Sequence, residues 1–587
     1  MRSWQKASMP SLLISTHTIA GWMVNAILPA IISCQSVRYR VNYCCNVLPH
    51  RKEEGGSMRR FTTTGVCIPE KHYMVNIEDR LAKIKKMVDD GKYFVINRAR
   101  QYGKTTTLVA LAKYLSDSCT VLNLSFQGIG AAGFETEQSF VQALCRLVIR
   151  EAKYGLTLPQ QTKSLMNDFI SRKNEKANLD ELFDCLLDWC YTAEKPIVMM
   201  IDEIDSATNN QVFLDFLAQL RESYLNRDAK GIITFQSVIL AGVSDVRHLK
   251  SKIRDEDQHK VNSPWNIAAD FNIDMSLSAE GIAGMLGDYE QDHHTGMDTQ
   301  AIAQLIYDYT SGYPFLVSRI CQLIDDGPVS DRLPESASAW SRTGIDEAVK
   351  VILNEKNALF DSLSGKLTNY PQLKQSLRRV LMEGEQFAYN PDQENLVQMQ
   401  MYGFITNKGG MVAISNRIFE TRLYNYFLSD EEMKDNTFSK EASIAKSLFI
   451  HDDQLDMPLI LERFRETFTQ IFGPLTDRFL EKDGRELFLL YLKPIINGTG
   501  NYYIEAQTRD QTRTDVIVDY LGHQYVIELK IWRGPRYHED GEKQLKEYLN
   551  YFNLDVGYML SFNFNKEKEV GLKIVQIDGK VLYEETI

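Results

Sequence analysis

The feature that most constrains this chain is a loop at residues 97–105, which follows an apolar run at 93–96 and precedes a helical pattern at 106–115. The loop reads Asn-Arg-Ala-Arg-Gln-Tyr-Gly-Lys-Thr. Its last three residues match the Walker pattern G-x-x-x-x-G-K-[ST], whereas Arg98 stands where the pattern has its first glycine. A strand, such a loop and a helix in this order predict the core of a P-loop nucleoside triphosphatase.

Phosphate binding by this loop would rest on backbone N–H groups at a helix N-terminus, where the helix dipole also favours anions. Lys104 would reach the β- and γ-phosphates, and the Thr105 hydroxyl would ligate Mg²⁺. The first glycine mainly serves the strand-to-loop turn, which other residues can make with strain, so Arg98 weakens the prediction without removing it. The residues expected to contact ATP are Arg100, Gln101, Tyr102, Gly103, Lys104, Thr105 and Thr106.

A second element supports a nucleotide site. Residues 195–203 read Lys-Pro-Ile-Val-Met-Met-Ile-Asp-Glu, a buried-strand pattern that ends in two carboxylates. Asp202 would hold the Mg²⁺, and Glu203 would orient the attacking water. A plain strand end can carry the same residues, but the two motifs in this order favour ATP binding. Ser244, after a further apolar run, is either a γ-phosphate sensor or a simple strand end.

Residues 58–246 alternate short apolar runs with helical segments, which predicts an α/β domain. The expected strands are 93–97, 119–124, 197–202 and 236–242, and the expected helices include 179–189 and 212–224.

The region after this domain is expected to be mainly helical. We assign 247–360 to a helical lid, in which Pro314 of a Ser-Gly-Tyr-Pro sequence begins a helix. That sequence is either a nucleotide-contacting motif like that of STAND-type ATPases or an ordinary turn. Residues 361–428 run helix, helix and then a hairpin around Lys-Gly-Gly, the order of a winged helix. The segment 429–455 begins with an acidic stretch poor in apolar residues and is predicted to be a linker.

The first 57 residues differ from the rest of the chain. Residues 11–34 contain no Lys, Arg, Asp or Glu, so they resemble a signal or membrane segment, but His17, Asn25 and Pro29 interrupt them. A purine-rich coding stretch just before Met58 would explain them as a ribosome-binding site read in frame. We therefore expect Met58 to be the true start and residues 1–57 to be a mis-annotated, disordered or anchoring extension.

Charge and cysteine content narrow the function classes. The net charge of −12 argues against a broad basic surface, so any nucleic-acid contact must be local. The nine cysteines contain no C-x-x-C pair, which suits a cytoplasmic protein without a structural zinc.

A second set of chemical residues lies at 513–530, which reads as a β-hairpin turning near Leu521 and Gly522. Such a turn places Asp515 opposite Glu528, with Lys530 on the same face. Two carboxylates and an ammonium group suit Mg²⁺-assisted phosphodiester hydrolysis, in which Asp515 and Glu528 ligate the metal and Lys530 positions the hydroxide.

Other residues could complete this site. Glu486 lies in a helical stretch upstream, and Gln544 and Tyr548 stand at i and i+4 on a downstream amphipathic helix. A surface hairpin with a cross-strand salt bridge remains the alternative, but the order D…ExK…QxxxY is more specific than E-x-K alone.

With both motifs placed, the chain resembles the bacterial proteins in which an AAA-ATPase-like domain is fused to a C-terminal PD-(D/E)xK nuclease-superfamily domain. The resemblance rests on residues 98–105, 202–203, 513–515 and 528–532. It implies a multidomain α/β protein with a P-loop, AAA-like core, a helical lid, a winged helix and a restriction-endonuclease-like domain at 456–587. Replacement of the first Walker glycine is common in that family.

The leading hypothesis is an ATP-regulated, Mg²⁺-dependent nuclease that acts on nucleic acid, DNA before RNA, and that could form a homo-oligomer. The alternative is a STAND-like nucleotide switch whose nuclease-like domain is only a binding module. A membrane-anchored ATPase is a third interpretation, which depends wholly on residues 1–57.

Overall fold

The structure is a computed structural model, and the structural statements below concern the part of the chain that it describes. The described residues are 59–172, 176–243, 246, 265–333, 339–382, 387–432, 437–472, 481–496, 499–507, 513–532, 534–565 and 568–587. Ser244 and residues 11–34 lie outside this part. No helix within it is long and apolar enough to cross a membrane.

The first domain is built on a parallel four-stranded sheet of order β1-β4-β3-β2. Its strands are β1 (Phe94–Asn97), β2 (Thr120–Ser125), β3 (Ile197–Asp202) and β4 (Ser237–Gly242). The four strands predicted from the apolar runs are therefore confirmed to within one residue at each end. An isolated parallel backbone bridge between Phe94 and Ala269 places a further segment of chain beside β1.

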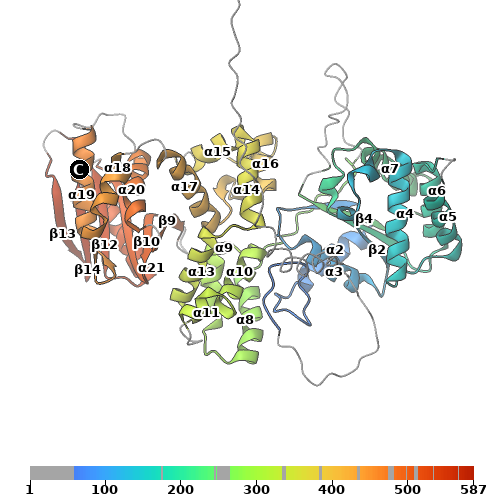
Figure 1. The fold of residues 1–587 in the computed structure, drawn as a ribbon, viewed down its shortest axis with the longest axis horizontal. Coiled ribbons are helices and arrows are strands. Elements are labelled where there is room, and N and C mark those ends of the chain that lie inside the picture. Colours follow the sequence, from blue (N-terminus) through green and yellow to red (C-terminus); the bar gives the residue numbers. More distant parts are fainter. Residues whose placement is uncertain are drawn as a thin grey trace, which may run out of the picture. The chain divides into compact units, whose positions relative to one another are not determined.

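Helices cover both faces of this sheet (Figure 1). Alternate residues of β3 face opposite ways: Val198 and Met200 pack with the first set of helices, and Met199 and Ile201 with the second. The first set is α2 (Glu78–Asp89) and α3 (Lys104–Leu115). The second set is α4 (Glu137–Lys153), α5 (Gln160–Ser171), α6 (Leu179–Thr192) and α7 (Gln211–Lys230). Burial on both faces explains why the strands read as unbroken apolar runs.

A helical region follows, as predicted. It contains α8 (Ala279–His293), α9 (Thr299–Thr310), α10 (Pro314–Asp325), α11 (Pro328–Arg332) and α13 (Arg342–Asn354). Ser278, Asp298 and Ser341 accept hydrogen bonds from backbone N–H groups at the starts of α8, α9 and α13. Gly312 has φ of 71°, and a Cβ there would lie 2.0 Å from the Leu277 carbonyl oxygen. The turn before α10 therefore requires glycine.

The next region contains the predicted hairpin. Its elements are α14 (Ala358–Asn369), α15 (Pro371–Leu381), α16 (Glu394–Met401), β5 (Ile405–Lys408), β6 (Met411–Ile414) and α17 (Arg417–Glu432). Gly409 and Gly410, both with positive φ, form the turn between the strands.

The segment 429–455, predicted to be a linker, contains regular secondary structure. Helix α17 continues through the acidic stretch to Glu432, and α18 (Thr437–Ala445), β7 (Ile450–His451) and β8 (Gln454–Leu455) follow. Ala442, Phe449 and Leu455 are buried, so burial of a few scattered apolar side chains outweighs the polar composition.

The C-terminal domain contains a six-stranded mixed sheet of order β13-β14-β12-β11-β10-β9. Its strands are β9 (Gly500–Gln507), β10 (Arg513–Tyr520), β11 (His523–Ile531), β12 (Val556–Phe562), β13 (Gly571–Ile577) and β14 (Lys580–Thr586). Strands β10 and β11 form the predicted hairpin, with Leu521 and Gly522 at positive φ in the turn. Helix α21 (Pro535–Phe552) connects β11 to β12, which run parallel.

Both faces of this sheet are covered. Phe562 of β12 packs against Phe468 of α19 (Met457–Phe472) and against Gly484 of α20 (Glu481–Ile496). On the other face, Leu545 and Leu549 of α21 pack on Gly557. The face that carries Glu528 is therefore buried under α21.

Candidate functional site

The phosphate loop connects β1 to α3, and its conformation depends on Gly103. Gly103 lies in the left-handed region with φ of 78° and directly precedes α3. Lys104 is buried, and its Nζ donates to the carbonyl oxygens of Arg98 and Ala99 at 2.9 Å each. Burial lowers the Lys104 pKa, although Asp205, Glu203 and Asp202 oppose the shift. The ammonium group thus rests inside its own loop, among three carboxylates.

The two Walker motifs meet at the carboxyl edge of the sheet. Thr105 Oγ1 donates to Asp202 Oδ2 at 2.6 Å, although the residues are 97 positions apart. They meet because β1 and β3 are parallel strands of one sheet and end at the same edge. A hydroxyl and a carboxylate oxygen in contact are the ligand types that Mg²⁺ takes beside phosphate groups. The donor set therefore fits the magnesium predicted from the sequence.

Glu203 follows Asp202 in a strained conformation. Its φ is 55°, and its backbone N–H donates to Asp202 Oδ1 at 2.9 Å. Left-handed backbone at a non-glycine residue is uncommon and concentrates at functional sites. Burial, with a smaller contribution from the Asp202 charge, raises the Glu203 pKa above 4.5.

This raised pKa predicts an acid limb in the ATP hydrolysis rate. A carboxyl group with a raised pKa stays protonated to a higher pH, and a protonated Glu203 could not accept a hydrogen bond from the attacking water. We expect the rate to fall on acidification, with a midpoint above that of an ordinary glutamate, measured between about pH 4 and pH 8. Glu203→Gln should leave only a slow rate without this limb. A wild-type rate that is flat over the same range would contradict the role of Glu203.

Arg98 does not point into the phosphate loop. Its guanidinium group donates to the carbonyl oxygens of Asn97 and Ile273, both at 2.9 Å, and stacks over Phe271 at 5.4 Å from the ring centroid. Its backbone φ is not positive, so the turn that it makes does not require glycine. The Arg98 side chain therefore packs away from the phosphate-binding residues, and its presence in place of glycine does not disturb the conformation of residues 101–105.

Arg98→Gly should consequently lower stability without strengthening ATP binding. The substitution removes two hydrogen bonds and a cation–π contact, and it adds backbone freedom to the unfolded chain. We expect the free energy of unfolding to fall by about 1–3 kcal/mol, measured by urea denaturation. Arg98→Lys, which keeps the charge, should lose less. A clear gain in ATP affinity for Arg98→Gly would show that Arg98 is a defect.

Other predicted nucleotide contacts lie around the loop. Tyr313, just before α10, donates its hydroxyl to the Arg100 carbonyl oxygen, and its ring lies 4.8 Å from that of Tyr102. A Cβ on Gly103 would lie 3.9 Å from Pro314 Cγ, so the start of α10 borders the loop. Thr106 instead accepts a hydrogen bond from the Cys67 N–H at 3.2 Å. Gln101 takes a positive φ of 56°.

The C-terminal residues predicted to act together form one connected group. Lys530 Nζ is 2.7 Å from Glu528 Oε1 and 3.3 Å from Gln544 Oε1. Gln544 Nε2 in turn donates to the Tyr548 hydroxyl at 2.5 Å. A Cβ on Gly541 would lie 3.3 Å from Lys530 Cε, so the glycine lets α21 approach the strand here. The E-x-K strand and the Q-x-x-x-Y helix therefore meet.

The structure does not place the other two predicted carboxylates, Asp515 and Glu486, in this connected group. The β10–β11 register pairs Val516 with Ile527, and continuing it by one step would place Asp515 opposite Glu528. The Asp515 side chain lies outside the described part of the chain. Glu486, on α20, lies with its Oε1 3.5 Å from Arg378 Nη2 of α15. Their roles in a metal site stay predictions.

Aromatic contacts that no motif indicated connect these regions. Tyr313 packs edge-on against Phe419 of α17 at 5.2 Å. Two residues before Phe419, Arg417 stacks over Tyr309 of α9 and over Tyr503 of β9, at 4.8 and 5.2 Å. Helix α17 therefore contacts the C-terminal sheet and also Tyr313, the residue that is hydrogen-bonded to the phosphate loop. These contacts join single residues that are far apart in the sequence, so no local sequence motif could have predicted them.

Residues 70–429 match a protein family described as the AAA-like domain. The Walker-type ATPase of Pyrococcus abyssi is 13% identical, covers 60% of this chain and 96% of its own, and has a TM-score of 0.41. Cdc6p from Pyrobaculum aerophilum is also 13% identical, covering 61% and 95%, with a TM-score of 0.30. The Thermotoga maritima RuvB branch migration motor is 12% identical, covering 62% and 98%, with a TM-score of 0.30. No curated protein matches the chain.

Proposed function

The chain belongs to the AAA-like domain family, and on this premise we propose that its ATP-binding domain controls Mg²⁺-dependent cleavage of nucleic acid by the C-terminal domain. The observation that carries the nuclease part is the connected group Glu528, Lys530, Gln544 and Tyr548. Its residues come from one strand and the helix that follows, in the order expected for a PD-(D/E)xK site.

In the ATP-binding domain, the proposed chemistry assigns one task to each residue. Thr105 and Asp202 would hold Mg²⁺, which neutralises charge on the phosphates. Lys104 would leave the carbonyl oxygens of Arg98 and Ala99 for the stronger, charged oxygens of the β- and γ-phosphates. Glu203 would orient the water for attack. Hydrogen bonds already join Thr105, Asp202 and the Glu203 backbone, and Lys104 stands next to Thr105 at the start of α3.

In the C-terminal domain, Glu528 and Asp515 would hold a second Mg²⁺, which would lower the pKa of a bound water and stabilise the transition-state charge. Lys530 would position the resulting hydroxide, and Gln544 would fix the Lys530 ammonium group. For Glu528 to bind metal, its ion pair with Lys530 must loosen. Binding of metal and substrate together would supply the charge that replaces it.

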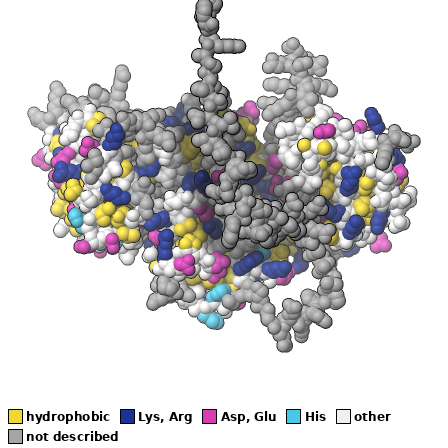
Figure 2. Space-filling model, in the orientation of Figure 1, with side chains coloured by type: hydrophobic (Ala, Val, Ile, Leu, Met, Phe, Trp, Pro, Cys, Tyr) yellow, Lys and Arg dark blue, Asp and Glu magenta, His cyan; other side chains and the backbone are white. Residues whose placement is uncertain are grey.

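The surface charge supports a local nucleic-acid contact. Figure 2 shows Lys and Arg side chains interspersed with Asp and Glu over the face in view. Together with the net charge of −12, this distribution argues against a substrate spread across a basic surface, so we expect any nucleic-acid contact to be local. We expect DNA to be preferred over RNA.

Contacts through α17 support control by nucleotide. Tyr313 bonds the Arg100 carbonyl oxygen and touches Phe419, and Arg417 of the same helix stacks on Tyr503 of the C-terminal sheet. A change in the phosphate loop when ATP is bound or hydrolysed would therefore act on α17 through Tyr313. Coupling through packed side chains requires this kind of continuous contact.

The proposal is tested by incubating the full chain with Mg²⁺ and a panel of single-stranded, double-stranded and branched DNA and RNA, with and without ATP. We expect cleavage of at least one DNA substrate, abolished by EDTA and by Asp515→Ala. Failure to cleave any substrate, or cleavage unaffected by Asp515→Ala, would contradict it.

One observation favours the alternative of a STAND-like switch with a C-terminal binding module. The Glu528 side chain is 1% exposed and the Lys530 side chain 13%, as expected of a buried structural ion pair. This alternative predicts ATP-dependent assembly, measured by light scattering, with no metal-dependent cleavage in any condition.

A further inference from the structure

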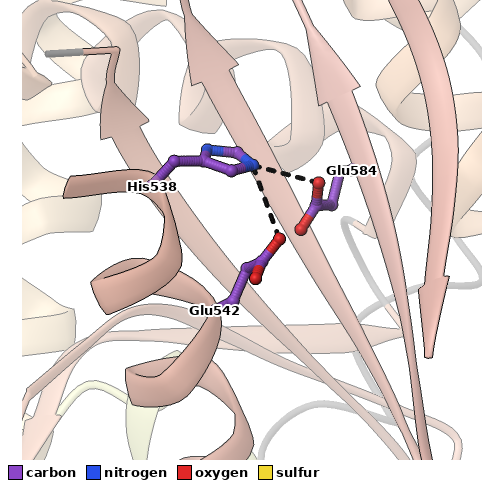
Figure 3. Close-up of side chains that lie close together, drawn as sticks. All are labelled: His538, Glu542 and Glu584. Atoms are coloured by element: carbon purple, nitrogen blue, oxygen red, sulfur yellow. Dashed lines mark hydrogen bonds and ion pairs between the residues drawn. The ribbon is translucent and has the colours of Figure 1, made fainter. Parts of the chain in front are cut away.

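A second group of metal-ligand side chains lies in the C-terminal domain, apart from Glu528 and Lys530. His538 and Glu542 stand one turn apart on α21, and Glu584 lies on β14. One ligand atom from each of the three lies within 4.8 Å of the other two. His538 Nε2 is 3.1 Å from Glu584 Oε2 and 3.8 Å from Glu542 Oε1, and the three side chains point toward one another (Figure 3).

Burial makes this arrangement unfavourable without a cation. The Glu584 side chain is 3% exposed, and its Oε1 atom has no hydrogen-bond partner in the structure. A buried polar atom left without a partner is destabilising because it has lost its hydrogen bonds to water. Desolvation and then the Glu584 charge raise the Glu542 pKa, as expected for two carboxylates that share a site. A divalent cation would satisfy the unpaired oxygen and remove the repulsion.

We propose that His538, Glu542 and Glu584 bind a divalent transition-metal ion of the Zn²⁺ class. An imidazole nitrogen and carboxylate oxygens are Zn²⁺ ligands, whereas Mg²⁺ and Ca²⁺ prefer oxygen ligands throughout. Three protein ligands leave a fourth position for water. The Trp532 ring packs beside the His538 ring, with 4.8 Å between the ring centroids. The hydrogen bond to Glu584 raises the His538 pKa, and the nearby Lys573 ammonium only partly opposes the raised pKa of His538 and of Glu542.

This site is distinct from the proposed nuclease site. Glu528 pairs in register with Met559 of β12, and Met559 pairs with Glu584. The two glutamates therefore share one sheet face but stand two strand spacings apart, roughly 10 Å. One ion cannot contact both. Zn²⁺ at the new site would tie α21 to β14, and this assignment holds whether or not the domain cleaves nucleic acid.

The test is isothermal titration of Zn²⁺ into the full chain, comparing wild type with single variants whose folding is checked by circular dichroism. His538→Gln and Glu542→Gln should each lose one equivalent of Zn²⁺, or bind it on the order of 100-fold more weakly. Glu539→Gln, an exposed neighbour on α21, should match wild type.

Thermal unfolding supplies a second measurement. Zn²⁺ should raise the midpoint of the wild type and of Glu539→Gln, and the increase should be smaller in Glu542→Gln. Equal Zn²⁺ uptake and an equal midpoint shift in wild type, His538→Gln and Glu542→Gln would overturn the site, and would indicate that Glu542 and Glu584 share a proton instead. Uptake of Mg²⁺ at this site as tight as that of Zn²⁺ would overturn the choice of metal.

Discussion

Lys104→Ala should reduce ATP hydrolysis on the order of 100-fold or more. Lys104 is the cation that the loop can direct at the β- and γ-phosphates, and its methylene stem is buried with its ammonium group among Asp202, Glu203 and Asp205. Truncation removes the charge that stabilises the transferring phosphoryl group and leaves those carboxylates facing the phosphates directly. ATP binding, measured by titration with a fluorescent analogue, should weaken as well.

The matched control for this variant is Lys113→Ala on the same helix. The Lys113 side chain is 80% exposed and forms a surface ion pair with Glu70 at 3.0 Å. Surface ion pairs contribute little, so hydrolysis by this variant should match wild type. Retention of most of the activity in Lys104→Ala would mean that residues 97–105 do not bind phosphate as proposed.

Glu528→Gln should abolish metal-dependent cleavage, with a loss on the order of 1,000-fold, because a carboxylate ligand to the metal supplies several kcal/mol of transition-state stabilisation. Glutamine keeps the volume of the buried side chain and can still accept a hydrogen bond from Lys530, but it carries no charge for the metal. Cleavage is measured with the best DNA substrate from the panel.

Loss of a partner from a buried ion pair can also destabilise a domain. ATP hydrolysis by the same Glu528→Gln sample and its circular dichroism spectrum therefore report whether the chain is folded. Glu547→Gln, an exposed change of the same type on α21, should cleave like wild type. Cleavage by a folded Glu528→Gln at the wild-type rate would exclude Glu528 as a metal ligand.

The sequence predicted those parts of the fold that local patterns determine. β3 is buried on both faces and so reads as an unbroken apolar run, which gave its limits directly. Paired glycines marked the β5–β6 turn, and Leu521 with Gly522 marked the β10–β11 turn, because both turns need positive φ. Once the turn was placed, the β10–β11 register followed from counting residues outward from the turn along both strands.

Features set by distant residues could not be predicted. The Arg98 guanidinium donates to the Ile273 carbonyl oxygen, 175 positions away. The residues next to Arg98 in the sequence therefore do not indicate how the loop accommodates an arginine in place of glycine. His538 and Glu542 read as an ordinary amphipathic helix, and only the sheet order brings Glu584 to them. The composition of 429–455 suggested a linker because the few residues that are buried there, such as Phe449, have little effect on the mean polarity of the segment.

The central claim is that nucleotide at the phosphate loop controls chemistry in the C-terminal domain. Its most direct test is the initial rate of DNA cleavage at fixed Mg²⁺, measured with and without ATP in the wild type and in Lys104→Ala. We expect ATP to change the wild-type rate severalfold and to leave the Lys104→Ala rate unchanged. A cleavage rate that is the same with and without ATP in the wild type, or an equal ATP response in both proteins, would contradict it.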